Sequence, residues 1–217
     1  MTSQFNEGLW KRRLHVLNKL KDMMLSNKDS IIHTRKISSF LTSLSEYADY
    51  HSNEFFDQCW SLLENNVQNN ESLWKEILFD FNRLFIGPDK LQAPPYESVY
   101  RDEGLIMGSS TLEVRNFYQS EGLKLENQGK EPDDHIGIEL EFLSYITRLI
   151  IMSQEKQAEE KINYYQELYE KFLNEHLLQW GLVFADLIID KAETKFMKGV
   201  GLYLKGFLKE EELQVNS

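Results

Sequence analysis

The sequence predicts an all-α protein: a single-domain helical bundle of about eight or nine helices with one long ordered loop. Apolar residues recur at three- and four-residue spacing through most of the 217-residue chain, whereas the alternating pattern of strands is scarce. All four prolines fall between positions 88 and 132, so the rest of the chain lacks the residue that most strongly breaks helices. A chain of this length can bury a sufficient core without disulfides or metals.

The N-terminal part of the chain is expected to contain four amphipathic helices. Their apolar stripes run over Leu9–Met24, Ile37–Ala48, Phe55–Leu63 and Leu73–Leu84. Asn70 is placed to cap the fourth of them. Apart from this periodicity, the first 70 residues carry no recognisable motif.

A long irregular segment, Ile86–Ser109, follows the fourth helix. Ser110 then opens the sequence Ser-Thr-Leu-Glu, which is typical of a capping box in which Glu113 bonds back to the start of the helix. Gly122 suits the position just after a helix end. The sequence therefore predicts one helix between Ser110 and Gly122.

The C-terminal half of the chain begins with a second polar loop, residues 123–131, which is a candidate hinge for domain exchange between protomers. The helix that starts near Pro132 is the most hydrophobic of the chain and has apolar residues on two faces, which indicates a central, buried position. Further helices are predicted over residues 156–174, 177–191 and 193–208.

The predicted domain organisation is simple. No internal repeat at a fixed period is visible in the sequence. We expect one domain over residues 1–209, followed by a flexible tail over residues 210–217.

The charge and the apolar segments restrict the class of partner. The net charge of −11 and a pI near 5.0 disfavour nucleic acid and anionic lipid and favour cationic partners. The single cysteine, Cys59, cannot form an intramolecular disulfide, and Met1–Trp10 lacks the apolar run of a secretory signal. Leu177–Ile189, among the longest apolar stretches, is interrupted by Gln179 and Asp186 and is too short to span a bilayer. These features predict a cytoplasmic protein without stable membrane insertion.

No catalytic, metal or cofactor site is predicted from motifs. The chain has no P-loop, no Glu-x-x-His pair, no His-Glu-x-x-His motif and no G-x-S-x-G elbow, and one cysteine excludes a cysteine-based zinc site. Gly199, Gly201 and Gly206 lack the spacing of a dinucleotide loop, so contacts between packed helices explain them better.

The first candidate binding segment is the loop Gly87–Gly108. The pair Pro94-Pro95 stiffens the backbone and precedes the sequence Tyr-Glu-Ser-Val-Tyr, which offers two aromatic rings, Tyr96 and Tyr100, and the carboxylate of Glu97. Loops of this length within a domain are usually functional or disordered, and the aromatic content argues against disorder. A loop whose rings simply pack on the bundle is an equally good explanation.

The second candidate segment is the acidic turn Glu131–Glu139. Its acids complement the positive end of a helix dipole, and one or both of Asp133 and Asp134 would be explained by helix capping alone. His135 and Glu139 lie four residues apart, on one helix face, and can form a hydrogen bond. Asp134 beside His135 could bind an arginine guanidinium through charge-assisted hydrogen bonds.

Four motifs, in order, resemble the TorD/DmsD family of redox-enzyme maturation chaperones. They are Leu84–Pro88, Pro94–Tyr100, Gly108–Thr111 and Glu131–His135. The similarity continues in the spacing of Phe172-Leu173, His176-Leu177 and Trp180, and covers roughly residues 75–200.

This resemblance implies an all-helical cytosolic chaperone. Such proteins bind the twin-arginine signal peptide of a molybdenum-cofactor oxidoreductase, hold the apoenzyme until the cofactor is inserted and so prevent premature export. The resemblance assigns Tyr96 and Tyr100 to an aromatic wall of the leader pocket, and Asp134 and His135 to its polar pair. Some members have tryptophan at the two tyrosine positions, which leaves leader specificity open.

Physical reasoning adds Glu97 and Glu139 to this predicted signal-peptide site, since a leader has a cationic start and an apolar core. Guanine-nucleotide binding, attributed to some relatives, has no P-loop to support it here. Two alternatives stay open: a NarJ-type assembly factor for a membrane-anchored nitrate reductase, and, more remotely, a small metal-dependent hydrolase that uses Asp134, His135 and Glu139. The sequence leaves open whether the protein is a monomer or a homodimer.

Overall fold

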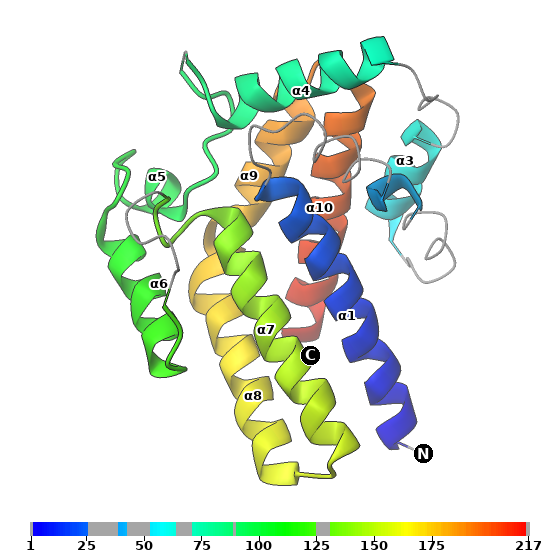
Figure 1. Ribbon diagram of the computed structural model, residues 1–217, viewed down its shortest axis with the longest axis vertical. Helices are drawn as coiled ribbons and strands as arrows, with labels where there is room; N and C mark the ends of the chain where they lie inside the picture. Colours follow the sequence, from blue (N-terminus) through cyan, green and yellow to red (C-terminus); the bar gives the residue numbers. More distant parts are fainter. Residues whose placement is uncertain are drawn as a thin grey trace. The chain divides into compact units, whose positions relative to one another are not determined.

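The computed structural model describes residues 2–25, 39–42, 53–63, 71–88, 90–124 and 131–215. Within these ranges the chain forms nine named α-helices and one π-helical turn, and the only pairing of the strand type is an isolated bridge (Figure 1). The helices are α1 (Thr2–Met24), α3 (Glu54–Leu63), α4 (Glu71–Phe85), α5 (Glu97–Arg101), α6 (Ser109–Ser120), α7 (Ile136–Glu155), α8 (Glu159–Phe172), the π-helical turn η2 (Leu173–Leu177), α9 (Leu178–Lys191) and α10 (Lys195–Val215). The predicted all-α class is confirmed.

The chain divides into two compact units, each assembled from two distant segments. The first unit comprises Met1–Met24 and Tyr96–Trp180, and the second comprises Leu25–Pro95 and Gly181–Ser217. The expectation of a single domain over residues 1–209 stays a prediction.

In the described part of the chain, no helix combines the length and the apolar character that crossing a membrane requires.

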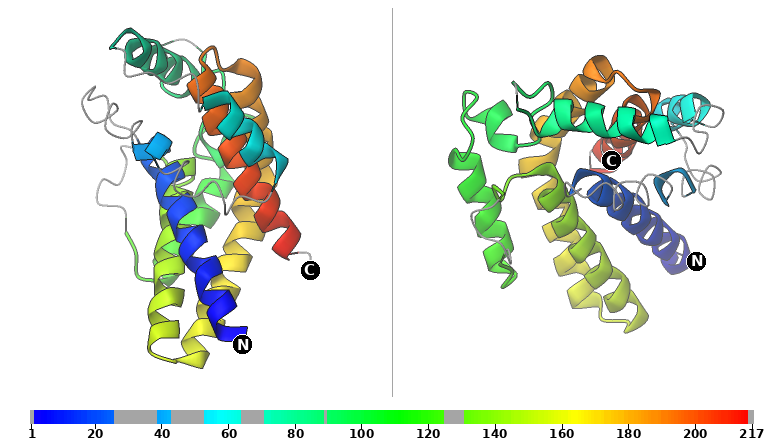
Figure 2. Two further views of the ribbon diagram at one scale, coloured as in Figure 1. Left: turned by 90° about the vertical axis from the view of Figure 1, so that its right-hand side faces the viewer. Right: turned by 45° about the horizontal axis from the view of Figure 1, so that its top comes forward.

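In the first unit, α7 is the central helix. It packs against α1 and against α8, and Figure 2 shows these three helices running alongside one another. Leu140, Leu143 and Ile146 are fully buried, which is the outcome expected from apolar residues on two faces. Asn18 of α1 accepts a hydrogen bond at 2.9 Å from the hydroxyl of Ser144, so polar contacts also join α1 to α7.

In the second unit, α10 packs against α3 and α4. A Cβ atom at Gly199 would lie 2.7 Å from Cδ1 of Leu63, and one at Gly201 would lie 2.9 Å from Cγ2 of Ile188. The predicted role of these glycines in helix packing is therefore confirmed. Thr194 caps the start of α10, since its hydroxyl accepts the backbone N–H of Met197 at 3.2 Å, and the Asp80 carboxylate of α4 fixes this cap by accepting the N–H of Thr194 at 2.7 Å.

Several predicted boundaries differ from the structure. α7 begins at Ile136 rather than near Pro132, because residues 132–135 form a turn in which the N–H of His135 bonds the carbonyl of Pro132 at 3.2 Å. α10 extends to Val215, beyond the predicted boundary of the tail at residue 210. The predicted cap Asn70 lies outside the described residues, as does most of the hinge segment.

The start of α6 also differs from its prediction. The helix begins at Ser109, and no capping box forms between Ser110 and Glu113. Asp102 supplies the cap from outside the helix, since its carboxylate accepts the backbone N–H of Ser110 at 2.9 Å. The predicted end is confirmed, because Gly122 has a φ of 70° and follows the last turn of the helix.

Candidate functional site

The two segments singled out in the sequence meet in the first unit. Tyr96 and His135 form an antiparallel bridge, and the backbone N–H of Glu97 donates to the carbonyl of Asp134 at 3.0 Å. The N–H of Ser98 donates to Oδ2 of Asp134 at 2.8 Å. The stiff aromatic loop and the acidic turn are therefore in direct contact, and their role as one binding site stays a prediction.

Asp134 caps the short helix α5 from a distant part of the chain. The N-cap residue of α5, Tyr96, makes no side-chain cap, so the Oδ2 bond to Ser98 takes this function. Asp134 is fully buried, and its Oδ1 atom has no hydrogen-bond partner among the residues that the structure describes. One oxygen of this carboxylate thus fixes α5 and the other is left for another donor.

His135 caps α7. Its Nδ1 atom accepts the backbone N–H of Gly137 at 3.0 Å, so this residue, and neither Asp133 nor Asp134, is the N-cap of the helix. Its ring makes an edge contact with Tyr96, with centroids 5.4 Å apart. Burial lowers the pKa of His135 to about 4, so the ring is neutral at physiological pH.

Glu97, at the start of α5, is paired with two cationic or polar partners. Its carboxylate lies 3.0 Å from Nδ1 of His176 and also accepts a hydrogen bond from Arg101. Arg101 in turn donates to the backbone carbonyl of Glu175 at 2.9 Å. Since Glu97 and His176 are both buried, these bonds fix α5 against the π-helical turn.

Glu139 is the least satisfied carboxyl group of the site. The indole Nε1 of Trp180 donates to its Oε2 atom at 3.4 Å, while Oε1 has no partner in the described part of the chain. The predicted hydrogen bond to His135 does not form. Burial, and then the nearby charges of Glu97 and Asp134, raise the pKa of Glu139 well above its usual range. The group is therefore held towards its neutral form.

Glu139→Gln is expected to raise the free energy of unfolding near pH 7, because the amide has the shape of the neutral carboxyl and has no charge to bury. A carboxyl whose pKa is raised by folding stabilises the fold fully only below its ordinary pKa of 4.5, and this stability is lost as pH rises towards the folded-state pKa. Urea unfolding near pH 4 and near pH 7 measures the effect, with the exposed Glu155→Gln as control. Equal stability of Glu139→Gln and wild type near pH 7 would contradict it.

Asp133 serves neither as a helix cap nor as a free charge. Arg115 of α6 donates to its Oδ2 atom through Nε at 2.8 Å and through a second guanidinium nitrogen. The hydroxyl of Tyr118 donates to the backbone carbonyl of Asp133 at 3.0 Å. The interpretation of Asp133 as a helix cap is therefore wrong: it connects the acidic turn to α6.

The six predicted binding residues divide by exposure. Glu97, Asp134 and Glu139 are each 0% exposed, and His135 is 8% exposed. Tyr96 and Tyr100 are partly exposed, and the Tyr96 hydroxyl donates to the exposed carboxylate of Glu131 at 3.2 Å. The tyrosines thus reach the surface, while the acids lie beneath them.

Three residues of this site were not predicted to take part. His176 and Trp180 carried a sequence signal only through the spacing shared with the family, and their pairing with Glu97 and Glu139 joins residues far apart in the chain. Arg115 carried no signal. The Tyr100 ring lies 5.2 Å from Trp180, so this tyrosine packs over the same buried group.

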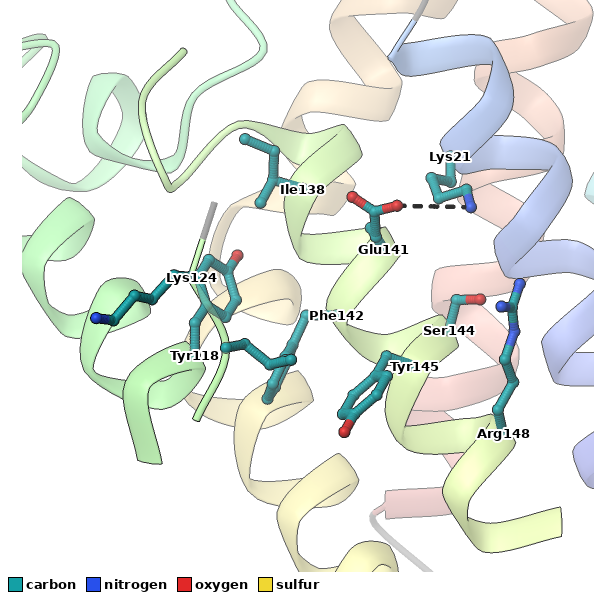
Figure 3. Close-up of a pocket in the computed structure, with 10 residues that line it drawn as sticks. Lys21, Tyr118, Lys124, Ile138, Glu141, Phe142, Ser144, Tyr145 and Arg148 are labelled. Carbon is teal, nitrogen blue, oxygen red and sulfur yellow. Dashed lines mark ion pairs between the residues drawn. The ribbon is translucent and has the colours of Figure 1, made fainter. Parts of the chain in front are cut away.

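A separate cavity of about 270 Å³ lies along α7, beyond its capped end. Figure 3 shows Ile138 and Phe142 on its apolar side and the Lys21 ammonium directed at Glu141, at 3.7 Å. Arg148, on the same helix, donates to Asn18 at 3.1 Å. The cavity therefore combines apolar walls with Lys21 and Arg148, two cations that already have partners. No group of His, Cys, Asp or Glu side chains among the described residues could hold a metal ion.

Comparisons with known proteins agree with this architecture. The family model described as nitrate reductase delta subunit matches residues 42–186. The chaperone protein TorD of Aliivibrio fischeri is 32% identical over 177 residues, which cover 80% of this chain and 79% of that protein. The Tat proofreading chaperone DmsD of Salmonella paratyphi A is 33% identical over 122 residues, or 56% of this chain and 53% of that protein.

A solved structure supports the fold. A protein of Archaeoglobus fulgidus, described as a candidate redox enzyme maturation protein, matches with a TM-score of 0.53 at 22% identity, covering 92% of this chain and 93% of that one. The family model spans most of the chain, and the TorD relative adds an independent match over most of its own length. The chain belongs to the TorD/DmsD family of redox-enzyme maturation chaperones.

Proposed function

We propose that this maturation chaperone acts in the cytoplasm and binds the twin-arginine signal peptide and the apo form of a molybdoenzyme catalytic subunit. Binding would assist cofactor insertion and prevent premature export. The proposal assigns no catalytic step and no cofactor to the chain itself, in line with the chaperone names of its relatives. It holds for a monomer or a homodimer.

The observation that carries this proposal is an uncompensated carboxylate below an aromatic surface. Glu97 is paired with His176 and Arg101, whereas Asp134 has no cationic partner among the residues described. Tyr96 covers this region and bonds the exposed Glu131. Negative charge near accessible rings suits a guanidinium that stacks on those rings and is attracted by the carboxylate.

We assign different roles to the predicted residues according to their exposure. Tyr96 and Tyr100 would contact the leader, since they are the members with accessible surface. Asp134, His135, Glu97 and Glu139 would position them, and Asp134 would add the attractive field. The net charge of −11 would speed the encounter with a cationic leader, and this contribution should weaken as salt rises.

Asp134→Asn is expected to weaken leader binding about tenfold, because the amide oxygen keeps the cap on α5 while the charge is lost. Tyr96→Ala is expected to weaken it by a similar factor. Calorimetry with the leader peptide of the client, identified by pull-down and mass spectrometry, measures both effects. The control Glu160→Gln makes the same charge change at an exposed position of α8.

Two outcomes count against the proposal. Unchanged affinity of Asp134→Asn and Tyr96→Ala would reject the site, and a wild-type protein that binds no leader would reject the function. The match to the nitrate reductase delta subunit model favours one second candidate, a NarJ-type assembly factor. That candidate predicts binding to a mature N-terminus that lacks twin arginines, which the same calorimeter can test.

A further inference from the structure

The cavity along α7 has the opposite charge balance to the rest of the chain. Three basic residues, Lys21, Lys124 and Arg148, line it, against one acidic residue, Glu141. The whole chain has 24 lysine and arginine residues against 35 aspartate and glutamate residues. All the residues that line the cavity belong to the first unit. Local positive charge within an acidic protein selects for an anionic ligand.

One side of the cavity is apolar. It is formed by Ile138 and Phe142 of α7, with Leu123 and the ring of Tyr118. The Phe142 and Tyr118 rings lie 5.0 Å apart, and both are buried. The Tyr118 hydroxyl already donates to the carbonyl of Asp133, so it needs no partner in the cavity. This side therefore suits the apolar part of a ligand.

The side towards α1 is polar and cationic. Figure 3 shows Lys21, Ser144 and Arg148 on this side of α7. Lys21 lies 3.7 Å from the Glu141 carboxylate, whose side chain is 54% exposed, so water screens this pair. Arg148 donates to the neutral amide of Asn18 and makes no ion pair within the described part of the chain. A carboxylate on this side would meet two cations, one of which no described acid neutralises.

The dimensions of the cavity restrict the size of the ligand. Its volume is about 270 Å³, slightly below the range that is typical of sites for drug-sized molecules. Phe142 and Arg148 are six positions apart on α7, so the apolar and cationic sides are separated by about 9 Å along the helix. A small molecule that joins an apolar body to one acidic group matches both this volume and this separation.

We propose that the cavity binds a small monocarboxylate with an aliphatic or aromatic body about 9 Å long. The carboxylate would accept charge-assisted hydrogen bonds from Lys21 and Arg148, while the body would pack on Phe142 and Leu123. Glu141 would oppose such a ligand, because it has the same charge and competes for Lys21. None of the six residues predicted to bind the leader lines the cavity, so the two sites can be tested separately.

The test is a titration of isotopically labelled protein with octanoate, followed through the backbone amide signals in NMR spectra. Two matched probes are octanamide, which has the same body without the charge, and acetate, which has the charge without the body. Arg148→Gln removes a cation, Arg148→Lys keeps one, and Glu141→Gln removes the competing acid; both positions are exposed. The control is Lys161→Gln, which removes an exposed cation of α8 outside the cavity. Circular dichroism checks that all variants are folded.

Wild-type protein is expected to bind octanoate with a dissociation constant of about 1 mM, and the amide signals of Glu141–Arg148 are expected to shift. Arg148→Gln is expected to weaken binding about fivefold and Arg148→Lys less, whereas Glu141→Gln is expected to strengthen it about threefold. Lys161→Gln should bind as wild type does. Octanamide and acetate are each expected to bind at least about tenfold more weakly than octanoate.

Three results would overturn the proposal. The first is the absence of any shift in the α7 signals up to about 10 mM octanoate. The second is an affinity for octanamide equal to that for octanoate, which would show an apolar cavity without selection for an anion. The third is an affinity for octanoate that neither Arg148→Gln nor Glu141→Gln changes. Each of these results leaves the proposed leader binding standing, because other residues carry it.

Discussion

Glu97→Ala is expected to lower the free energy of unfolding by about 3–5 kcal/mol, because it removes one partner from a buried, charged cluster. Glu97 is 0% exposed, and its carboxylate lies 3.0 Å from Nδ1 of the buried His176. After the substitution, His176 would have a polar ring in an apolar setting formed by Phe117 and Phe172, whose rings lie 5.1 Å from it. An unpaired buried polar group is among the few defects that produce losses of this size.

Chemical denaturation near pH 7 measures this loss. The matched control is Glu113→Ala, an exposed glutamate of α6, which is expected to change stability by less than about 0.5 kcal/mol. Glu97→Gln should lower the free energy of unfolding less than Glu97→Ala does, because the amide keeps the shape of the side chain and a hydrogen-bond acceptor. A loss below about 1 kcal/mol for Glu97→Ala would show that the cluster contributes little to the fold.

The helices were predictable from the sequence because their signals are local. The stripes Leu9–Met24 and Phe55–Leu63 correspond to α1 and α3, and the two-faced apolar pattern gave the central helix α7. Helix starts were less predictable, because distant residues supply their caps. Asp102 replaces the predicted capping box of α6, and Asp134 caps α5 across 36 positions of the sequence.

The candidate site was predictable in outline and not in its chemistry. The meeting of Tyr96 with His135 followed from two unusual segments considered together. The pairing of Glu97 with His176 joins residues 79 positions apart, and no local pattern specifies it. Burial could not be predicted from the sequence. The carboxylates of Glu97, Asp134 and Glu139, which were predicted to bind the leader, are buried, so exposure decides which residues can contact a partner.

The titration of His135 is expected to lower the free energy of unfolding of the wild-type protein by about 3 kcal/mol between neutral pH and pH 4. The variant His135→Asn is expected not to show this decrease. Burial lowers the pKa of His135 from 6.5 to about 4, so the unfolded chain takes up a proton at higher pH than the folded one. The contribution of this residue to stability is therefore complete above pH 6.5 and is lost as pH falls towards 4. At about 1.4 kcal/mol per unit, the difference of 2.5 units gives the stated loss.

Asparagine is the informative replacement because its side chain can accept the Gly137 N–H and so preserve the cap on α7. Urea unfolding at several pH values gives the stability difference between the two proteins, in which the titration of all other groups cancels. A difference that does not change between pH 7 and pH 4 would mean that the ring is solvated. A neutral His135 has a consequence for recognition as well: the ring carries no positive charge at physiological pH, so a cationic leader meets no repulsion from this residue.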